Sequence, residues 1–177
     1  MIFKNFLNIK NNKIIKKDFL NLIKHQPQVF ETLKPTYKYS YSKKEISKYK
    51  KFSNIRVIGM GGSILGTEAI YDFLKKKIKK KITFVNNLNS NADYFQDKNI
   101  NLNLIISKSG NTLETIVNAN TLIKSKENNI VITEKKDSYL TNLASQLKAE
   151  IFEHKNYVGG RYSVLSEVGM LPAELMN

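Results

Sequence analysis

The sequence contains no cysteine among its 177 residues, so it can form no disulfide framework and has no thiolate for catalysis. It also lacks any apolar run long enough to cross a bilayer. The N-terminal stretch MIFKNFLNIKNNK has neither the continuous apolar segment nor the small-residue cleavage site of a secretory signal peptide. We therefore expect a cytoplasmic protein without a membrane partner.

Arginine is scarce, although the formal net charge is +14. Arg56 and Arg161 are the only arginines, and the other basic residues are lysines scattered among asparagine and isoleucine. Base readout and forked phosphate contacts usually depend on arginine. The lysine-rich stretches 43–51 and 75–81 are the best candidates for a nucleic-acid patch, and we interpret them as solvated surface. The composition thus argues against a nucleic-acid partner.

Five short apolar segments alternate with helical patterns after residue 51. The predicted strands are residues 55–58, 82–85, 102–106, 130–133 and 150–152. The predicted helices are residues 64–77, a short helix around Asp93, 112–126, 138–148 and a last helix after Arg161. This alternation predicts an α/β fold with a doubly wound, mostly parallel five-stranded sheet. In such sheets, ligands bind at the carboxyl ends of the strands.

Residues 1–51 differ from this pattern and predict an N-terminal helical extension. An apolar stripe that includes Ile14, Phe19 and Leu22 is typical of one amphipathic helix. Pro27 and Pro35 interrupt the segment that follows it. We expect the extension to cover the sheet formed by residues 52–177.

The stretch from Ser107 to Thr112, with the sequence SKSGNT, joins the third predicted strand to a helix. The first N–H groups of a helix have no partner within the helix, and the helix dipole favours negative charge there. Ser107, Ser109 and Thr112 add hydroxyl groups, Lys108 adds an ammonium group, and Gly110 lets the backbone expose several N–H groups together. The pattern therefore fits a phosphate site. It also fits an ordinary helix cap, because Ser, Thr and Asn are common at that position.

Two glycine turns are the other candidates. The first, from Gly59 to Ser63, lacks the glycine spacing of a dinucleotide fingerprint and the Gly-Lys-Ser/Thr of a Walker A loop. This turn would let a ligand approach the backbone closely and would add the Ser63 hydroxyl. The alternative is that its glycines serve only the geometry of the strand-to-helix turn. The second, Gly159-Gly160-Arg161, places a permanent guanidinium beside exposed N–H groups, which suits an oxyanion. A helix-capping arginine is the alternative.

Three motifs together resemble the N-terminal part of the glucose-6-phosphate isomerase family: residues 58–66, IGMGGSILG, 106–115, ISKSGNTLET, and 158–172, VGGRYSVLSEVGMLP. The first two would fit any sugar-isomerase (SIS) domain, whereas the third is more specific. The resemblance implies that residues 52–177 form an SIS domain that binds a sugar phosphate and uses neither a cofactor nor a metal. Its implied substrate-binding residues are Gly62, Ser63, Ser107, Lys108, Ser109, Thr112 and Gly160. Arg161 is the implied catalytic residue, which stabilises an enediolate.

The resemblance also has a gap. The family's catalytic glutamate, histidine and late lysine belong to segments beyond the matched region, and His25 and His154 match no catalytic position. We therefore expect a fragment of a longer isomerase that is a homodimer at full length, with negligible turnover by this chain alone. A non-catalytic phosphosugar-binding module is the alternative. The expected exposed apolar face of such a fragment comprises Val164, Leu165, Val168, Leu171 and Leu175.

Overall fold

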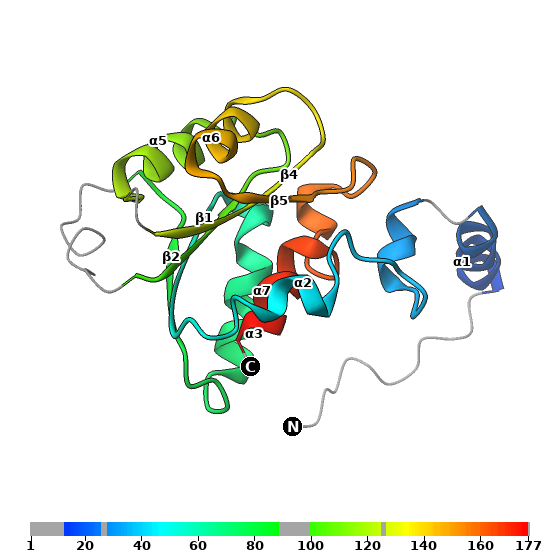
Figure 1. Ribbon diagram of the computed structural model, residues 1–177. Coiled ribbons are helices and arrows are strands. Elements are labelled where there is room, and N and C mark those ends of the chain that lie inside the picture. The colour runs from blue at the N-terminus through cyan, green and yellow to red at the C-terminus, as the bar shows by residue number, and fades with distance from the viewer. Residues whose placement is uncertain (1–12, 26–27, 89–99, 125–126, 177) are drawn as a thin grey trace.

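The computed structural model describes residues 13–25, 28–88, 100–124 and 127–176. Its centre is one sheet of five parallel strands in the order β2-β1-β3-β4-β5 (Figure 1). The strands are β1 (Asn54–Gly59), β2 (Lys81–Val85), β3 (Leu102–Ile106), β4 (Asn128–Thr133) and β5 (Glu150–Glu153). The predicted α/β sheet is therefore confirmed, with strand bounds close to those expected. The short helix expected around Asp93 lies outside the described residues.

Helices cover both faces of the sheet, as expected for a doubly wound fold. Among the described residues, the α-helices after β1 are α3 (Leu65–Leu74), α5 (Leu113–Leu122), α6 (Tyr139–Leu147) and α7 (Glu167–Leu175). Alternate residues of β3 point to opposite faces, since Leu104 packs in one buried cluster with α7 and Ile105 packs in the other with α5 and α6. All five residues of β3 are buried, as in a strand that is covered on both sides.

The N-terminal extension covers the sheet only in part. In α1 (Lys13–His25), Ile14 is 70% exposed and Phe19 is 59% exposed, and the helix stands away from the sheet in Figure 1. The short helix α2 (Lys43–Ser47) instead buries Ile46 completely in the core. The prediction of a covering extension is wrong for α1 and right for α2. An apolar stripe predicts an amphipathic helix but does not identify the surface on which it packs.

The last helix, α7, corrects a second expectation. Val168, Leu171 and Leu175 are fully buried, because α7 packs against α3 and the sheet. The hydroxyl of Thr67 on α3 donates a hydrogen bond to the carbonyl of Val168 at 3.1 Å, which fixes this contact. Of the predicted exposed face, only Leu165 is exposed, and Val164 is half-buried.

Candidate functional site

The carboxyl ends of β1 and β3 lie side by side. Gly59, the last residue of β1, is in register with Ile106, the last residue of β3. A Cβ atom on Gly59 would lie 3.1 Å from the Ile106 carbonyl oxygen and 3.3 Å from the Ser63 Cβ atom. The turn that contains Ser63 therefore starts beside the loop that begins at Ser107, as the parallel sheet predicts.

Three hydroxyl groups gather at the start of α5. The Ser107 Oγ lies 2.8 Å from the Thr112 Oγ1, and the Ser109 Oγ lies 3.4 Å from both. The Gly110 amide donates to the Ser107 hydroxyl at 3.2 Å, and the Asn111 amide donates to the Ser109 hydroxyl at 3.2 Å. Thr112 occupies the cap position of α5, but its side chain makes no capping hydrogen bond. Its hydroxyl therefore contributes to the cluster and not to an ordinary cap.

Glycine is required at position 110 for two reasons. Its φ of +70° lies in the left-handed region, and a Cβ atom there would lie 2.2 Å from the Ser138 Oγ. Ser138 begins α6 with its own capping box, and the Leu140 amide donates to the Gly110 carbonyl at 3.0 Å. The loop from Ser107 to Thr112 is thus held between the starts of α5 and α6.

The Lys108 ammonium group has partners elsewhere. It donates to the Asn156 carbonyl at 2.6 Å and lies 3.6 Å from the Glu134 Oε1. The pKa of Glu134 lies below its ordinary value, chiefly because Lys136 donates a hydrogen bond to its carboxylate. Burial opposes part of this shift, and the charge of Lys108 supports it. Glu134 is therefore ionised at neutral pH. The sequence predicted Lys108 to be a phosphate-binding residue. In the structure, the ammonium group of Lys108 instead contacts the segments that follow β4 and β5.

The second glycine turn packs on the first. A Cβ atom on Gly62 would lie 2.2 Å from the Gly160 carbonyl oxygen and 2.9 Å from the Arg161 nitrogen. The Ser163 hydroxyl connects the two turns, at 3.1 Å from the Gly62 carbonyl and 2.7 Å from the Gly160 carbonyl. The structure therefore joins the GGS and GGR motifs, which are about a hundred residues apart in the sequence.

The two arginines have different surroundings. Arg161 is exposed and lines a groove of about 470 Å³ together with Leu33, Tyr162 and Leu165, among other residues. Arg56 is buried, and its guanidinium donates to the Leu122 carbonyl at 2.9 Å. Arg56 therefore has a structural role, whereas Arg161 is accessible to a ligand.

Two buried polar residues, one within the third motif and one just before it, were not predicted to matter. The Glu167 carboxylate, which is fully buried, accepts hydrogen bonds from the Tyr37 hydroxyl at 3.0 Å and from the Ser40 amide at 2.8 Å. The His154 ring is also buried, and its Nδ1 lies 3.1 Å from the Lys155 carbonyl. Glu167 lies in the third motif and is one of two glutamates in a mostly apolar helix, but neither feature indicates its partners.

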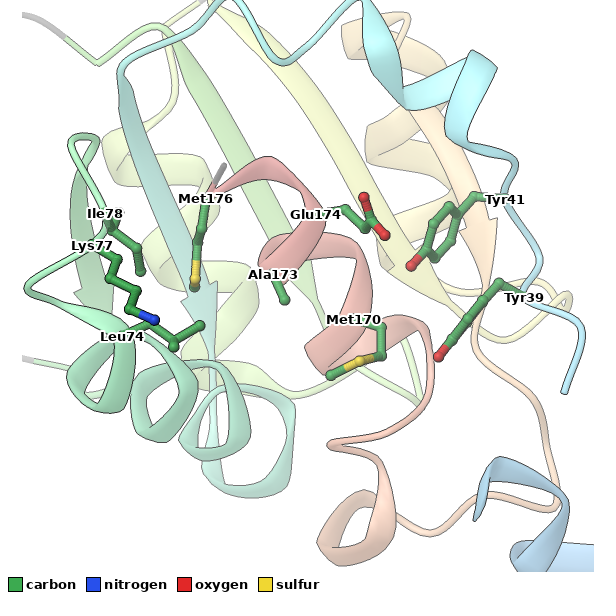
Figure 2. Close-up of a pocket in the computed structure, with 9 residues that line it drawn as sticks. All are labelled: Tyr39, Tyr41, Leu74, Lys77, Ile78, Met170, Ala173, Glu174 and Met176. Carbon is green, nitrogen blue, oxygen red and sulfur yellow. The ribbon is translucent and has the colours of Figure 1, made fainter. Parts of the chain in front are cut away.

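A separate cleft of about 450 Å³ lies between α3, α7 and the extended segment with Tyr39 and Tyr41 (Figure 2). Met170 and Glu174 of α7 point into it. None of the predicted site residues lines this cleft. In the described ranges, no group of three or more His, Asp or Glu side chains converges in a way that could hold a metal ion. None of the described helices is both long and apolar enough to span a membrane.

The parallel sheet, with glycine turns and a hydroxyl-bearing loop at its carboxyl edge, has the fold of SIS-domain sugar isomerases. A hypothetical protein from Thermus thermophilus superimposes with a TM-score of 0.72 at 19% identity, over 93% of this chain and 44% of that protein. Tagatose-6-phosphate ketose/aldose isomerase from Escherichia coli gives a TM-score of 0.54 at 16% identity, over 91% of this chain and 45% of the enzyme. These likenesses establish the fold.

Sequence similarity establishes the family. Residues 5–177 match the phosphoglucose isomerase family, and the chain belongs to it. It is 39% identical to the glucose-6-phosphate isomerase of Methanocaldococcus jannaschii, over 72% of this chain and 34% of that enzyme. It is 35% identical to the glucose-6-phosphate isomerase of Borreliella afzelii, over 69% of this chain and 26% of that enzyme. The match thus spans about a third or less of the length of these relatives.

Proposed function

We propose that residues 52–177 form the sugar-phosphate-binding part of a glucose-6-phosphate isomerase. The observation that carries this proposal is the cluster of the Ser107, Ser109 and Thr112 hydroxyls at the start of α5, where no side chain caps the helix. Hydroxyl donors, unpaired helix N–H groups and the positive end of the helix dipole together suit a phosphate dianion. The substrate would be glucose 6-phosphate or fructose 6-phosphate, bound in the cytoplasm without a cofactor.

The neighbouring turns would hold the sugar carbons. Gly62 and Gly160 hold the two turns against each other, Ser63 lies in the first turn, and Arg161 in the second turn is exposed. Interconversion of an aldose and a ketose passes through an enediolate, whose negative charge a fixed guanidinium stabilises. Arg161 is the residue that we assign to this step.

Proton transfer between C1 and C2 also needs a base, and opening of the ring needs an acid–base pair. No residue of this chain is assigned to either role. Of its two histidines, His154 is buried and His25 lies on α1, away from the sheet. We therefore expect the chain alone to bind phosphosugars and to turn over negligibly. In the full-length enzyme, which we propose to be a homodimer, other segments would supply these groups.

Calorimetric titration of the 177-residue chain with fructose 6-phosphate tests the phosphate site. Thr112→Val removes one hydroxyl at nearly constant volume, and we expect affinity to fall about tenfold, as for loss of one hydrogen bond to a charged group. Thr121→Val, at the other end of α5, is the matched control and should leave the affinity unchanged. If Thr112→Val binds as tightly as the wild-type chain, the phosphate site is not at this loop.

A second titration tests Arg161. In 6-phosphogluconate, a carboxylate replaces the aldehyde at C1 and supplies negative charge where the enediolate would carry it. Arg161→Met should weaken binding of 6-phosphogluconate by about tenfold, and binding of inorganic phosphate by less than about twofold. Equal losses for both ligands would contradict the assigned role of Arg161.

A further inference from the structure

Lys108 is attached to the protein at both its backbone and its charged end. Its carbonyl accepts from the Glu134 amide at 3.2 Å and from the Thr133 hydroxyl at 3.4 Å. Its ammonium group donates to the Asn156 carbonyl at 2.6 Å and lies 3.6 Å from the Glu134 carboxylate. The residue therefore links the loop that follows β3 to the segments that follow β4 and β5.

A phosphate ligand would have to compete for this ammonium group. To bind a phosphate, the Lys108 side chain would have to break its ion pair with Glu134 and its short, charge-assisted hydrogen bond to the Asn156 carbonyl. The Glu134 carboxylate, which also pairs with Lys136 at 2.5 Å, repels an anion placed next to it. The contacts of the ammonium group thus favour a structural attachment over a ligand contact.

The attachment reaches the third motif along a short stretch of chain. The His154 amide donates to the Thr133 carbonyl at 2.8 Å, and Val158, two residues after Asn156, is fully buried. Gly160 and Arg161 follow shortly after. The Lys108 contact with Asn156 therefore holds the hydroxyl-bearing loop against the segment that leads to the Arg161 turn.

We propose that Lys108 is a positioning residue, whose ammonium group fixes the loop from Ser107 to Thr112 through Glu134 and the Asn156 carbonyl and does not contact the phosphate. That the ligand is a sugar phosphate rests on the function proposed above. A positioning role makes a distinctive prediction about Glu134. Loss of a carboxylate beside a phosphate site should strengthen anion binding on electrostatic grounds, whereas loss of the partner of a positioning lysine should weaken it.

The test compares Lys108→Met, Glu134→Gln and the double variant, with Lys136→Met as the control that removes the other partner of Glu134. Fructose 6-phosphate is titrated into each full 177-residue chain. Each single variant should bind about fivefold more weakly, and the double variant no more weakly than either single variant, because both remove one contact. The control should change by less than about twofold, as expected for an exposed ion pair.

Amide hydrogen exchange provides a readout that needs no ligand. The Gly110 and Asn111 amides, which donate to hydroxyls of the loop, should exchange faster in both single variants and not in the control. Tighter or unchanged binding by Glu134→Gln, with weaker binding by Lys108→Met, would make Lys108 a direct ligand and overturn the proposal. Unchanged exchange in both would also overturn it. If the wild-type chain binds no fructose 6-phosphate but the exchange changes as expected, the positioning role stands and the proposed function fails.

Discussion

Gly62 packs against Gly160 so closely that position 62 has no room for a side chain. A Cβ atom on Gly62 would lie 2.2 Å from the Gly160 carbonyl oxygen, whereas a Cβ atom on Gly160 would approach Gly62 only to 4.0 Å from its Cα. A side chain is therefore excluded at position 62 but not at position 160. The identity of residue 62 decides where the turn that carries Arg161 can lie.

Gly62→Ala should displace the Arg161 turn. We expect the free energy of unfolding to fall by about 1–3 kcal/mol, as for other overpacked sites. Binding of 6-phosphogluconate should weaken more than binding of inorganic phosphate, because Arg161 moves and the loop at Ser107 does not. Urea unfolding and calorimetric titration of the variant measure the two effects.

Gly159→Ala is the matched control for this substitution. Gly159 has a φ of −69°, which any residue adopts, and its Cβ atom would lie 3.4 Å from the Tyr162 ring, an ordinary contact. This variant should retain the stability and the affinities of the wild-type chain. If Gly62→Ala behaves like Gly159→Ala, the close contact between the two turns has no functional consequence.

The sequence predicted the parts of the site that depend on neighbouring residues. The strand, the turn and the helix start around Ser107 lie within a few residues of one another, and glycine at position 110 marks a backbone that only glycine adopts easily. The partners of Lys108 could not be predicted in this way. Glu134 and Asn156 are 26 and 48 residues further along the chain, and only the pairing of β3, β4 and β5 brings them together.

His154 should make the stability of the chain depend on pH. Its Nδ1 carries the proton if it donates to the Lys155 carbonyl, and its buried Nε2 has no hydrogen-bond partner among the described residues. Burial lowers the pKa of His154, and the charge of Lys108 lowers it further. The Lys155 carbonyl and the charges of Glu167 and Glu134 oppose the shift.

The unfolded chain, in which His154 has an ordinary pKa of about 6.5, therefore binds its proton more readily than the folded chain. Stability from this residue should be present above about pH 6.5 and decrease as the pH falls towards the lowered pKa of the folded state. Urea unfolding at about pH 7.5 and about pH 5.5, on either side of that value, measures the decrease. His154→Asn should make it smaller, and His25→Asn, on exposed α1, should not. An equal decrease in both variants would exclude His154 as its source.

Glu167 should anchor the N-terminal segment to α7. Glu167→Ala would leave the Tyr37 hydroxyl and the Ser40 amide without their acceptor, and we expect it to lower the free energy of unfolding by about 2–3 kcal/mol. Tyr37→Phe removes one donor only and should lower it by about 1 kcal/mol. Tyr162→Phe, at a side chain that is 65% exposed, is the control and should change little. Similar small effects of all three substitutions would show that the segment is held by other contacts.

Burial is the property that sequence patterns predicted least well. The apolar positions of α1 and α7 are both typical of amphipathic helices, yet Phe19 is 59% exposed and Leu171 is fully buried. The difference arises because α7 contacts α3, about a hundred residues earlier in the chain, through Thr67 and Val168. Periodicity describes one helix at a time, whereas burial depends on which helices meet.

Substitutions in the two N-terminal helices should therefore differ in effect. Phe19→Ser on α1 should change the free energy of unfolding by less than about 0.5 kcal/mol, as for most surface positions. Ile46→Ala on α2 should lower it by about 2–5 kcal/mol, because the side chain is completely buried in the core. Urea unfolding monitored by circular dichroism compares the two. A loss of more than about 1 kcal/mol in Phe19→Ser would mean that α1 packs against the protein in solution.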